Sequence, residues 1–206
     1  NAWTARGESK SLPLRVTWDG RGRLPVESET DPTLVSLPEN LRIDVERLTL
    51  NAVGDAETDR EKANAVAAFF HNNFEYSLDT NLVGPNHPLI HFIEERRPAY
   101  CIYFASAMAA MLRTQQIPSR VVSGYLPSPP NPVTGRVTVR RCDAHVWVEA
   151  WLEDEERFVA FDPTPGASRD SVIGLSREPG MLAGLRDAVI SQVRRAWARY
   201  RFNPRG

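Results

Sequence analysis

Three residues of different types could together carry out nucleophilic acyl chemistry: Cys101, His145 and Asp162. Cys101 opens the segment CIYFASAMAAMLRTQQ, whose Ala, Met and Leu residues predict a helix that is apolar nearly all round and therefore buried. A thiol at the first turn of a helix lies in the positive field of the helix dipole, which favours the nucleophilic thiolate. Taken alone, Cys101 is better explained as a small apolar residue of the core, as most free cysteines are.

His145 and Asp162 supply the partners that such a thiol needs. His145 lies at the start of the predicted strand AHVWVEAWL, and Asp162 ends the next predicted strand, RFVAFD. If the turn between them is centred on Glu153 and Asp154, the two side chains face each other directly, with Cβ atoms ~5 Å apart. A carboxylate beside a histidine fixes its tautomer and stabilises the imidazolium, and a histidine beside a cysteine activates the nucleophile. The three residues therefore predict a nucleophile, a base and an orienting acid.

The same register also satisfies the apolar pattern of the hairpin. It places one set of alternating side chains on a single face, and a slip of one residue would turn that set away from the core. The set consists of Val146, Val148, Ala150, Val159 and Phe161. The core pattern and the pairing of His145 with Asp162 therefore favour the same alignment of the two strands.

The elements that must position these residues follow an order of helices first and strands later. Helical periodicity begins near residue 56, where Thr58 and Glu61 form a capping box. Further helices are predicted over 89–95, over the Cys101 segment and over 179–202, and strands over 12–18, 120–126, 136–140, 144–152 and 157–162. The strand at 120–126 is expected to be buried. This order predicts an α+β fold in which one antiparallel sheet packs on helices.

The composition excludes several classes of protein. The chain has 206 residues, 42% of them hydrophobic, and a formal net charge of −1. The apolar content excludes a wholly disordered chain, and the balanced charge argues against nucleic acid as a partner. No apolar run approaches the ~18 residues of a membrane span. Two cysteines are too few for a disulfide framework.

Three blocks of sequence, in order along the chain, resemble the transglutaminase-like superfamily. They are RPAYCIYFASAMAAMLRTQQIPSRVVSGY (97–125), DAHVWVEAWL (143–152) and FVAFDPTPG (158–166). The resemblance covers roughly residues 55–166 and is closest to bacterial membrane-anchored members. It implies a papain-like fold, in which the helix bearing the cysteine packs on an antiparallel sheet bearing the histidine and the aspartate. It also implies that Cys101, His145 and Asp162 are the catalytic triad, that the substrate is a protein or peptide, and that no metal or organic cofactor is needed.

The resemblance further implies a division of the chain and a location. An N-terminal strand and loop extension (1–54) would precede the catalytic core (55–166), and a helical extension (167–206) would follow it. Because the members that it resembles place this domain outside the cytoplasm, we expect a periplasmic or cell-surface domain of a membrane-anchored parent. The chain begins with Asn1 and not with Met, so we expect a piece of a longer protein.

Two departures from the family pattern lie beside the nucleophile. Ala99 stands where the family usually has Gly, and Ile102 and Tyr103 stand where it often has Glu-His. They leave the triad intact and bear on the range of substrates. The acyl acceptor stays open: with an amine the protein is a transglutaminase-like acyltransferase working through a thioester, and with water it is a cysteine protease or amidase. A catalytically idle domain that binds partners in the cell envelope is the alternative from another class.

The same residues allow two other uses. Cys101, Cys142 and His145 could contribute to a metal site, although residues three apart on a strand point to opposite faces and the chain has no Cys-x-x-Cys pair. A disulfide between Cys101 and Cys142 would consume the nucleophile.

The predicted C-terminal helix raises a separate question. Between Glu178 and Gly206, six Arg residues accompany an apolar stripe. The stripe could dock on the domain or lie at a membrane surface. Arginines beside a membrane span on the outer face would oppose the positive-inside rule. We therefore expect the helix to dock on the domain.

Overall fold

The fold is organised around a central helix, α4 (Cys101–Thr114), which carries the candidate nucleophile at its first position. The computed structural model of the chain describes residues 31–166, except 85, 127–130, 132, 134–136 and 138. The predicted strand at 12–18 and the predicted helix at 179–202 lie outside the described residues.

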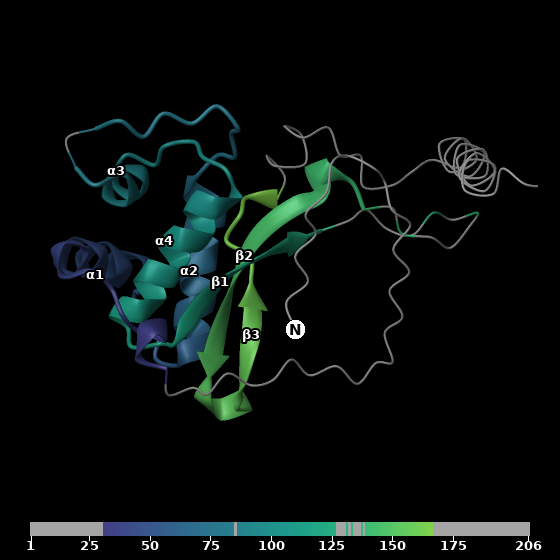
Figure 1. The fold of residues 1–206 in the computed structure, drawn as a ribbon. Helices are drawn as coiled ribbons and strands as arrows, with labels where there is room; N and C mark the ends of the chain where they lie inside the picture. Colours follow the sequence, from purple (N-terminus) through teal and green to yellow (C-terminus); the bar gives the residue numbers. More distant parts are fainter. Residues whose placement is uncertain are drawn as a thin grey trace, which may run out of the picture.

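Helices precede an antiparallel sheet in the described part of the chain, as the sequence predicted. The helices are α1 (Glu39–Val53), α2 (Asp59–Asn73), α3 (Pro88–Glu94) and α4, and short 3₁₀ turns lie at Pro32–Leu34, Arg141–Asp143 and Glu153–Glu155. The strands are β1 (Ser119–Tyr125), β2 (Ala144–Leu152) and β3 (Arg157–Phe161), paired antiparallel in the order β1-β2-β3. Figure 1 shows α4 between the sheet and α1, which confirms the α+β arrangement.

Helix α4 is buried on most sides because its sequence offers apolar residues at almost every position. It packs against β1, β2 and the helices α1, α2 and α3. The hydroxyl of Ser119, at the start of β1, donates a hydrogen bond of 3.1 Å to the carbonyl of Ala109 and ties the sheet directly to this helix. Its largest fully buried side chains are Phe104, Met108, Met111 and Leu112. No helix among the described residues is long and apolar enough to cross a bilayer.

Helix α2 begins at the capping box that the sequence predicted. The amide of Glu61 donates to the Thr58 hydroxyl at 3.2 Å, and the amide of Thr58 donates to the Glu61 carboxylate at 2.9 Å. At the other end of the helix, buried Phe70 contacts the rings of Phe92 in α3 and Phe104 in α4, with centroids 6.0 and 5.9 Å away. These rings join the end of α2 to the first turns of α4, where Cys101 lies.

Residues 39–53 differ from the expectation of a strand and loop extension, because they form helix α1. Its buried side chains belong to the common core and follow a helical spacing; they are Leu41, Val45, Leu48 and Val53. The neighbouring Pro38 suggests a loop in the sequence, but it occupies the N-cap position, where a missing backbone N–H costs the helix nothing. The division of the chain into three parts otherwise stays a prediction.

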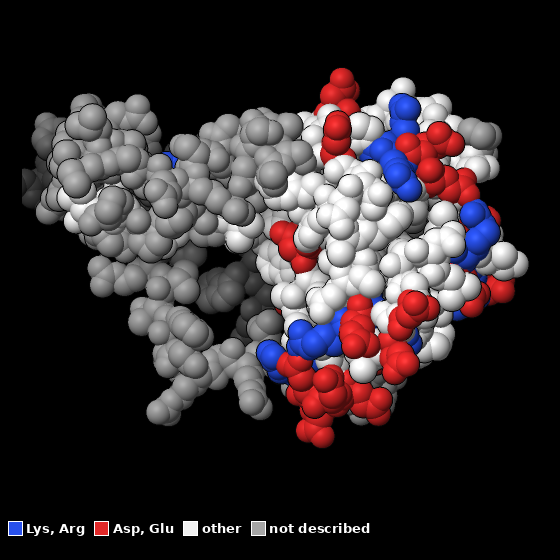
Figure 2. Space-filling model, turned by 180° about the vertical axis from the view of Figure 1, so that it is seen from behind, with Lys and Arg blue, Asp and Glu red and all other residues white. Residues whose placement is uncertain are grey.

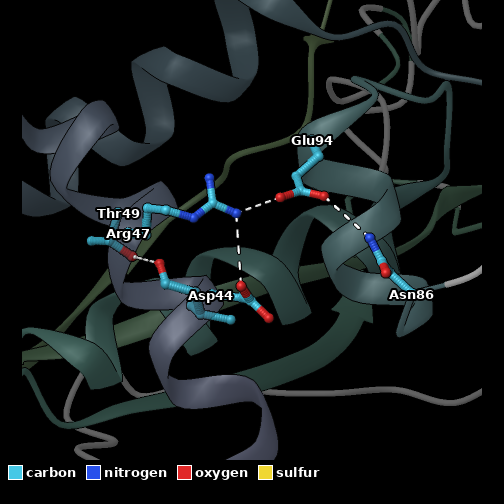
Figure 3. A network of polar contacts seen from close by, with 6 residues as sticks. Asp44, Arg47, Thr49, Asn86 and Glu94 are labelled. Carbon is cyan, nitrogen blue, oxygen red and sulfur yellow. Dashed lines mark hydrogen bonds and ion pairs between the residues drawn. The ribbon is translucent and has the colours of Figure 1, made fainter.

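Charged side chains also tie α1 to α3 (Figure 3). Arg47 of α1 forms ion pairs with Glu94 of α3 and, at 3.7 Å, with Asp44. Glu94 in turn accepts a hydrogen bond of 3.4 Å from Asn86, which precedes α3. Because exposed ion pairs contribute only about 0–1 kcal/mol each, this network adds little to the stability of the fold.

Two predicted strands differ from the structure. β1 is an edge strand and not a buried one: in the described part of the chain it pairs with β2 alone, and Val121 and Tyr125 are 40% and 58% exposed. The strand predicted at 136–140 is not formed at its described positions, since residues 137, 139 and 140 belong to no strand. Val137 and Val139 are about half exposed, so these two apolar side chains do not form the buried face of a strand.

Acidic side chains gather at the end of the molecule formed by the β2–β3 turn (Figure 2). The turn residues 153–156 are all acidic, and Glu155 forms ion pairs with Arg60 and Arg157. A hollow of about 620 Å³ lies here, lined by Asp59, Gln116, Pro118, Trp151, Glu153 and Glu156. Because Trp151 and His145 lie near opposite ends of β2, this hollow is separate from the predicted triad.

Candidate active site

The chain that leads into Cys101 is fixed by backbone hydrogen bonds. The amide of Ala99 donates to the carbonyl of Glu75 at 3.3 Å, and the amide of Ser77 donates to the carbonyl of Ala99 at 2.9 Å. Tyr100 follows in an extended conformation and is the N-cap residue of α4, without a side-chain hydrogen bond to the first turn. No side chain therefore caps the first turn of α4, and the backbone amide of Ile102 lies within reach of the Cys101 thiol.

The surroundings of Cys101 stabilise its thiolate. Burial raises the pKa of the Cys101 thiol, but the hydrogen bond and charge of His145 outweigh it, helped by the backbone amides of Val146 and Ile102. The net result is a pKa below that of an ordinary cysteine. The Val146 amide can reach the sulfur because β3 ends at Phe161, which leaves the adjoining edge of β2 open.

His145 is buried and contacts the candidate orienting acid through one ring nitrogen. Its Nε2 lies 2.7 Å from Oδ2 of Asp162, and only 3% of the residue is exposed. The same imidazole lies close enough to the Cys101 thiol to lower its pKa. The structure thus brings the three predicted residues together in the order thiol, imidazole, carboxylate.

Asp162 is held as an ionised carboxylate although it is partly buried. Burial raises its pKa, but the hydrogen bond and charge of His145 and the hydrogen bonds of Thr164 outweigh this effect, so the pKa lies below the usual range. The Thr164 amide donates to Oδ1 at 3.0 Å. The side chain of His71 reaches the backbone of the same residue, with Nε2 2.8 Å from the Asp162 carbonyl oxygen. Neither Thr164 nor His71 was found from the sequence.

The direct pairing of His145 with Asp162 was wrong in register. Val148 faces Phe161, and continuing this alignment would place Asp162 opposite Trp147, two residues from His145. A shift by two residues keeps every side chain on its predicted face, and diagonal neighbours ~7–8 Å apart remain within reach of longer side chains. The histidine and the carboxylate therefore meet diagonally.

The departures beside the nucleophile leave this arrangement intact. Ala99 is fully buried, and its φ is not positive, so its backbone does not demand a glycine. The Tyr103 ring packs edge-on against Tyr100 at 5.0 Å and lies tilted against Phe92 at 6.2 Å. Ile102 is partly exposed. Ile102 and Tyr103 thus place an aliphatic and an aromatic side chain next to the nucleophile, where the family often has Glu-His.

The alternative uses of these residues find no support in the described part of the chain. Cys101 and Cys142 are both free thiols, and Cys142 is exposed. No group of three or more His, Cys, Asp or Glu side chains that could hold a metal ion occurs among the described residues.

Comparison with known families bears directly on this site. The family model described as "Transglutaminase-like superfamily" matches residues 46–163, which is more than half of the chain and includes all three residues of the predicted triad. The chain belongs to the transglutaminase-like superfamily. Membership confirms the resemblance drawn from the sequence and the papain-like fold class.

The relatives of this transglutaminase-like chain are bacterial. A protein-glutamine gamma-glutamyltransferase of Pseudomonas aeruginosa is 35% identical over 164 residues, which cover 80% of this chain and 22% of that protein. The uncharacterized protein YebA of Bacillus subtilis is 30% identical over 139 residues, which cover 64% of this chain and 19% of that protein. The chain therefore spans about a fifth of the length of these curated relatives.

Solved structures resemble the transglutaminase-like fold described above. The periplasmic domain of TgpA from Pseudomonas aeruginosa bound to ethylmercury matches with a TM-score of 0.56 and 30% identity, over 66% of this chain and 50% of that one. A second crystal structure of the same periplasmic domain matches with a TM-score of 0.54 and 28% identity, over 68% of this chain and 48% of that one.

Gly124 lets Trp147 lie beside the candidate base. The Trp147 ring stacks on the His145 ring at 6.4 Å, and a Cβ added to Gly124 would lie 2.7 Å from the Trp147 ring. Because the φ of Gly124 is not positive, Gly124→Ala tests space and not backbone conformation. We expect it to cost about 1–3 kcal/mol of unfolding free energy, as overpacking does, and to slow alkylation of Cys101.

Urea unfolding and alkylation kinetics measure both effects of Gly124→Ala. The double variant Gly124→Ala/Trp147→Phe provides the control, because a smaller ring removes the clash and should recover the stability. Wild-type stability and wild-type alkylation in Gly124→Ala would show that Trp147 does not position His145.

Proposed function

We propose that this transglutaminase-like domain catalyses cysteine-dependent acyl transfer on glutamine-type amides or peptides through a thioester on Cys101. The observation that carries the proposal is the position of His145, whose Nε2 lies 2.7 Å from the Asp162 carboxylate and whose imidazole lowers the pKa of the Cys101 thiol. The Pseudomonas aeruginosa relative named as a protein-glutamine gamma-glutamyltransferase supports the same class of reaction.

In the first half of the reaction the thiolate of Cys101 attacks the carbonyl carbon of the amide. The negative charge that develops on the carbonyl oxygen would be stabilised by the Cys101 backbone amide, which is among those that a helix start leaves unpaired. The His145 imidazolium then donates a proton to the amide nitrogen of the tetrahedral intermediate. The C–N bond breaks, and the nitrogen leaves as ammonia or as the amine of a cleaved peptide. Asp162 stabilises that imidazolium and fixes its orientation.

In the second half His145, now neutral, accepts a proton from the incoming nucleophile. The nucleophile attacks the thioester carbon, and the C–S bond breaks to regenerate the thiolate. A primary amine gives an amide product, whereas water gives an acid. Neither half of this reaction calls for a metal or an organic cofactor.

We also propose that the domain works outside the cytoplasm, on protein or peptide substrates. Support comes from the solved relatives, which are described as periplasmic domains. A membrane-anchored parent, as the family resemblance implies, would hold the site close to the cell envelope.

One experiment separates the acceptors. The chain is incubated with a peptide that contains a single internal glutamine, with and without a fluorescent primary amine, and ammonia release and amine incorporation are both measured. We expect both signals, their complete loss in Cys101→Ala, and their retention in Cys142→Ala, which removes an exposed thiol away from the helix start.

The other outcomes have distinct meanings. Ammonia release without incorporation of the amine would make water the acceptor and the protein an amidase, and cleavage of the peptide would make it a protease. No turnover by a folded chain would favour the idle binding domain over the enzyme.

A further inference from the structure

The backbone of Asp162 lies beyond the regular hydrogen bonding of the sheet. β3 ends at Phe161, so the ladder with β2 stops one residue before the candidate orienting acid. The Asp162 side chain is 43% exposed, so packing alone does not fix it. The position of this carboxylate therefore depends on individual hydrogen bonds.

One of these bonds comes from a part of the chain far from the triad in sequence. His71 lies in the last turn of α2, and its Nε2 is 2.8 Å from the backbone carbonyl oxygen of Asp162. Helix α2 is itself anchored, because the neighbouring Phe70 is fully buried in the ring cluster and the helix packs against α4, β2 and β3. His71 thus connects a rigid helix to the residue that follows β3.

The chemistry of this bond is simple. A carbonyl oxygen can only accept, so Nε2 of His71 must carry the proton, in the neutral Nε2–H tautomer or in the imidazolium. Both forms donate, so the contact persists whichever form His71 takes. The bond fixes the peptide plane between Asp162 and Pro163, and with it the direction in which the Asp162 side chain leaves the backbone.

We propose that His71 is a positioning residue for the triad, which holds the main chain of Asp162 so that its carboxylate meets Nε2 of His145. The inference rests on the proposed function, since it assigns a task within the same site. His71 acts through Asp162 and takes no proton from the substrate or the thiol. It adds a fourth residue, from helix α2, to the assembly of Cys101, His145 and Asp162.

The test compares two substitutions of similar size in the 206-residue chain. In His71→Gln the side-chain amide can still donate near the position of Nε2, whereas in His71→Met nothing can donate. Asn72→Ala is the matched control, because Asn72 is exposed on the same helical turn. The readouts are the pH profile of Cys101 alkylation in a Cys142→Ser background and the separate effects on kcat and KM.

We expect His71→Met to move the alkylation profile to higher pH and to lower kcat about tenfold with little change in KM, because each pKa unit changes the thiolate population tenfold. His71→Gln should recover most of the wild-type behaviour, and Asn72→Ala should match the wild type. Identical behaviour of the Gln and Met variants, or a wild-type profile in His71→Met, would overturn the proposal. Alkylation needs no substrate, so it tests the role of His71 even if the wild type transfers no acyl group. Absence of acyl transfer by the wild type would instead contradict the proposed function.

Discussion

Asp162→Asn is expected to leave the chain folded and to reduce amide turnover by orders of magnitude. The two side chains have nearly the same shape, and the Asn oxygen can still accept the hydrogen bond that Thr164 donates to Oδ1. The amide NH₂ group, however, can present a donor to Nε2 of His145, which favours the wrong tautomer, and it cannot stabilise the imidazolium. In a serine triad the analogous change costs about 10⁴ in rate.

The effect of Asp162→Asn should be somewhat smaller here than in a serine triad, because the lowered pKa of the Cys101 thiol already favours the thiolate before substrate binds. The measurement is amide turnover beside melting temperature. Asp154→Asn, the same change at an exposed position of the same hairpin, is the control and should alter neither. Full activity in Asp162→Asn would remove Asp162 from the site, and loss of folding together with activity would give it a structural role.

His145→Ala is expected to remove most of the reactivity of Cys101 below neutral pH. In the wild type the pKa of the thiol is lowered, so the thiolate persists as the pH falls until that lowered pKa is reached. Without His145 the burial that raises the pKa remains, while the main opposing contribution is gone, and the pKa moves toward or above the ordinary value of ~8.5. At pH 6.5 we expect alkylation to slow by at least about tenfold, whereas the two rates should converge above pH 9.

The comparison is made in a Cys142→Ser background, so that Cys101 is the only thiol of the chain. His91→Ala serves as the control, because His91 lies in α3, outside the triad. It should reproduce the wild-type profile. If the profiles of His145→Ala and the wild type coincide, Cys101 and His145 do not form a reactive pair.

The residues of the candidate site could be predicted from the sequence because their types and faces follow simple periodicities. The alternation of β2 assigns His145 to one face and Val148 to the other, whatever the length of the turn. The apolar segment after Cys101 can only be a buried helix, which places the thiol at a helix start. These inferences use local sequence alone, and the structure agrees with them.

The exact register could not be predicted, because the turn carries no sequence signal for its length. Glu153–Glu155 form a 3₁₀ turn, and Glu156 adopts a left-handed conformation with a φ of 48°. This conformation normally favours Gly or Asn, and four acidic residues in a row give no indication of where the chain reverses. The error of two residues in the pairing of His145 comes from this turn.

Other features depend on contacts between distant elements. The exposure of β1 follows from its place at the edge of the sheet, which the apolar sequence of the strand does not encode. The contact of His71 with Asp162 joins residues 91 positions apart, and a histidine near the end of a helix has many other uses. Such contacts become visible only in three dimensions.

The assembly of the site from one local pair and one distant residue has a consequence for how the protein matures. His145 and Asp162 lie 17 residues apart in a single hairpin, so they can meet as soon as β2 and β3 pair. Cys101 joins them only when α4 docks on the sheet, and contacts of this longer separation close later, since they require a larger loss of chain entropy. Until then the thiol keeps the acidity of an ordinary cysteine. A nascent or partly folded chain in which α4 has not docked on the sheet therefore lacks the contact that makes its nucleophile reactive.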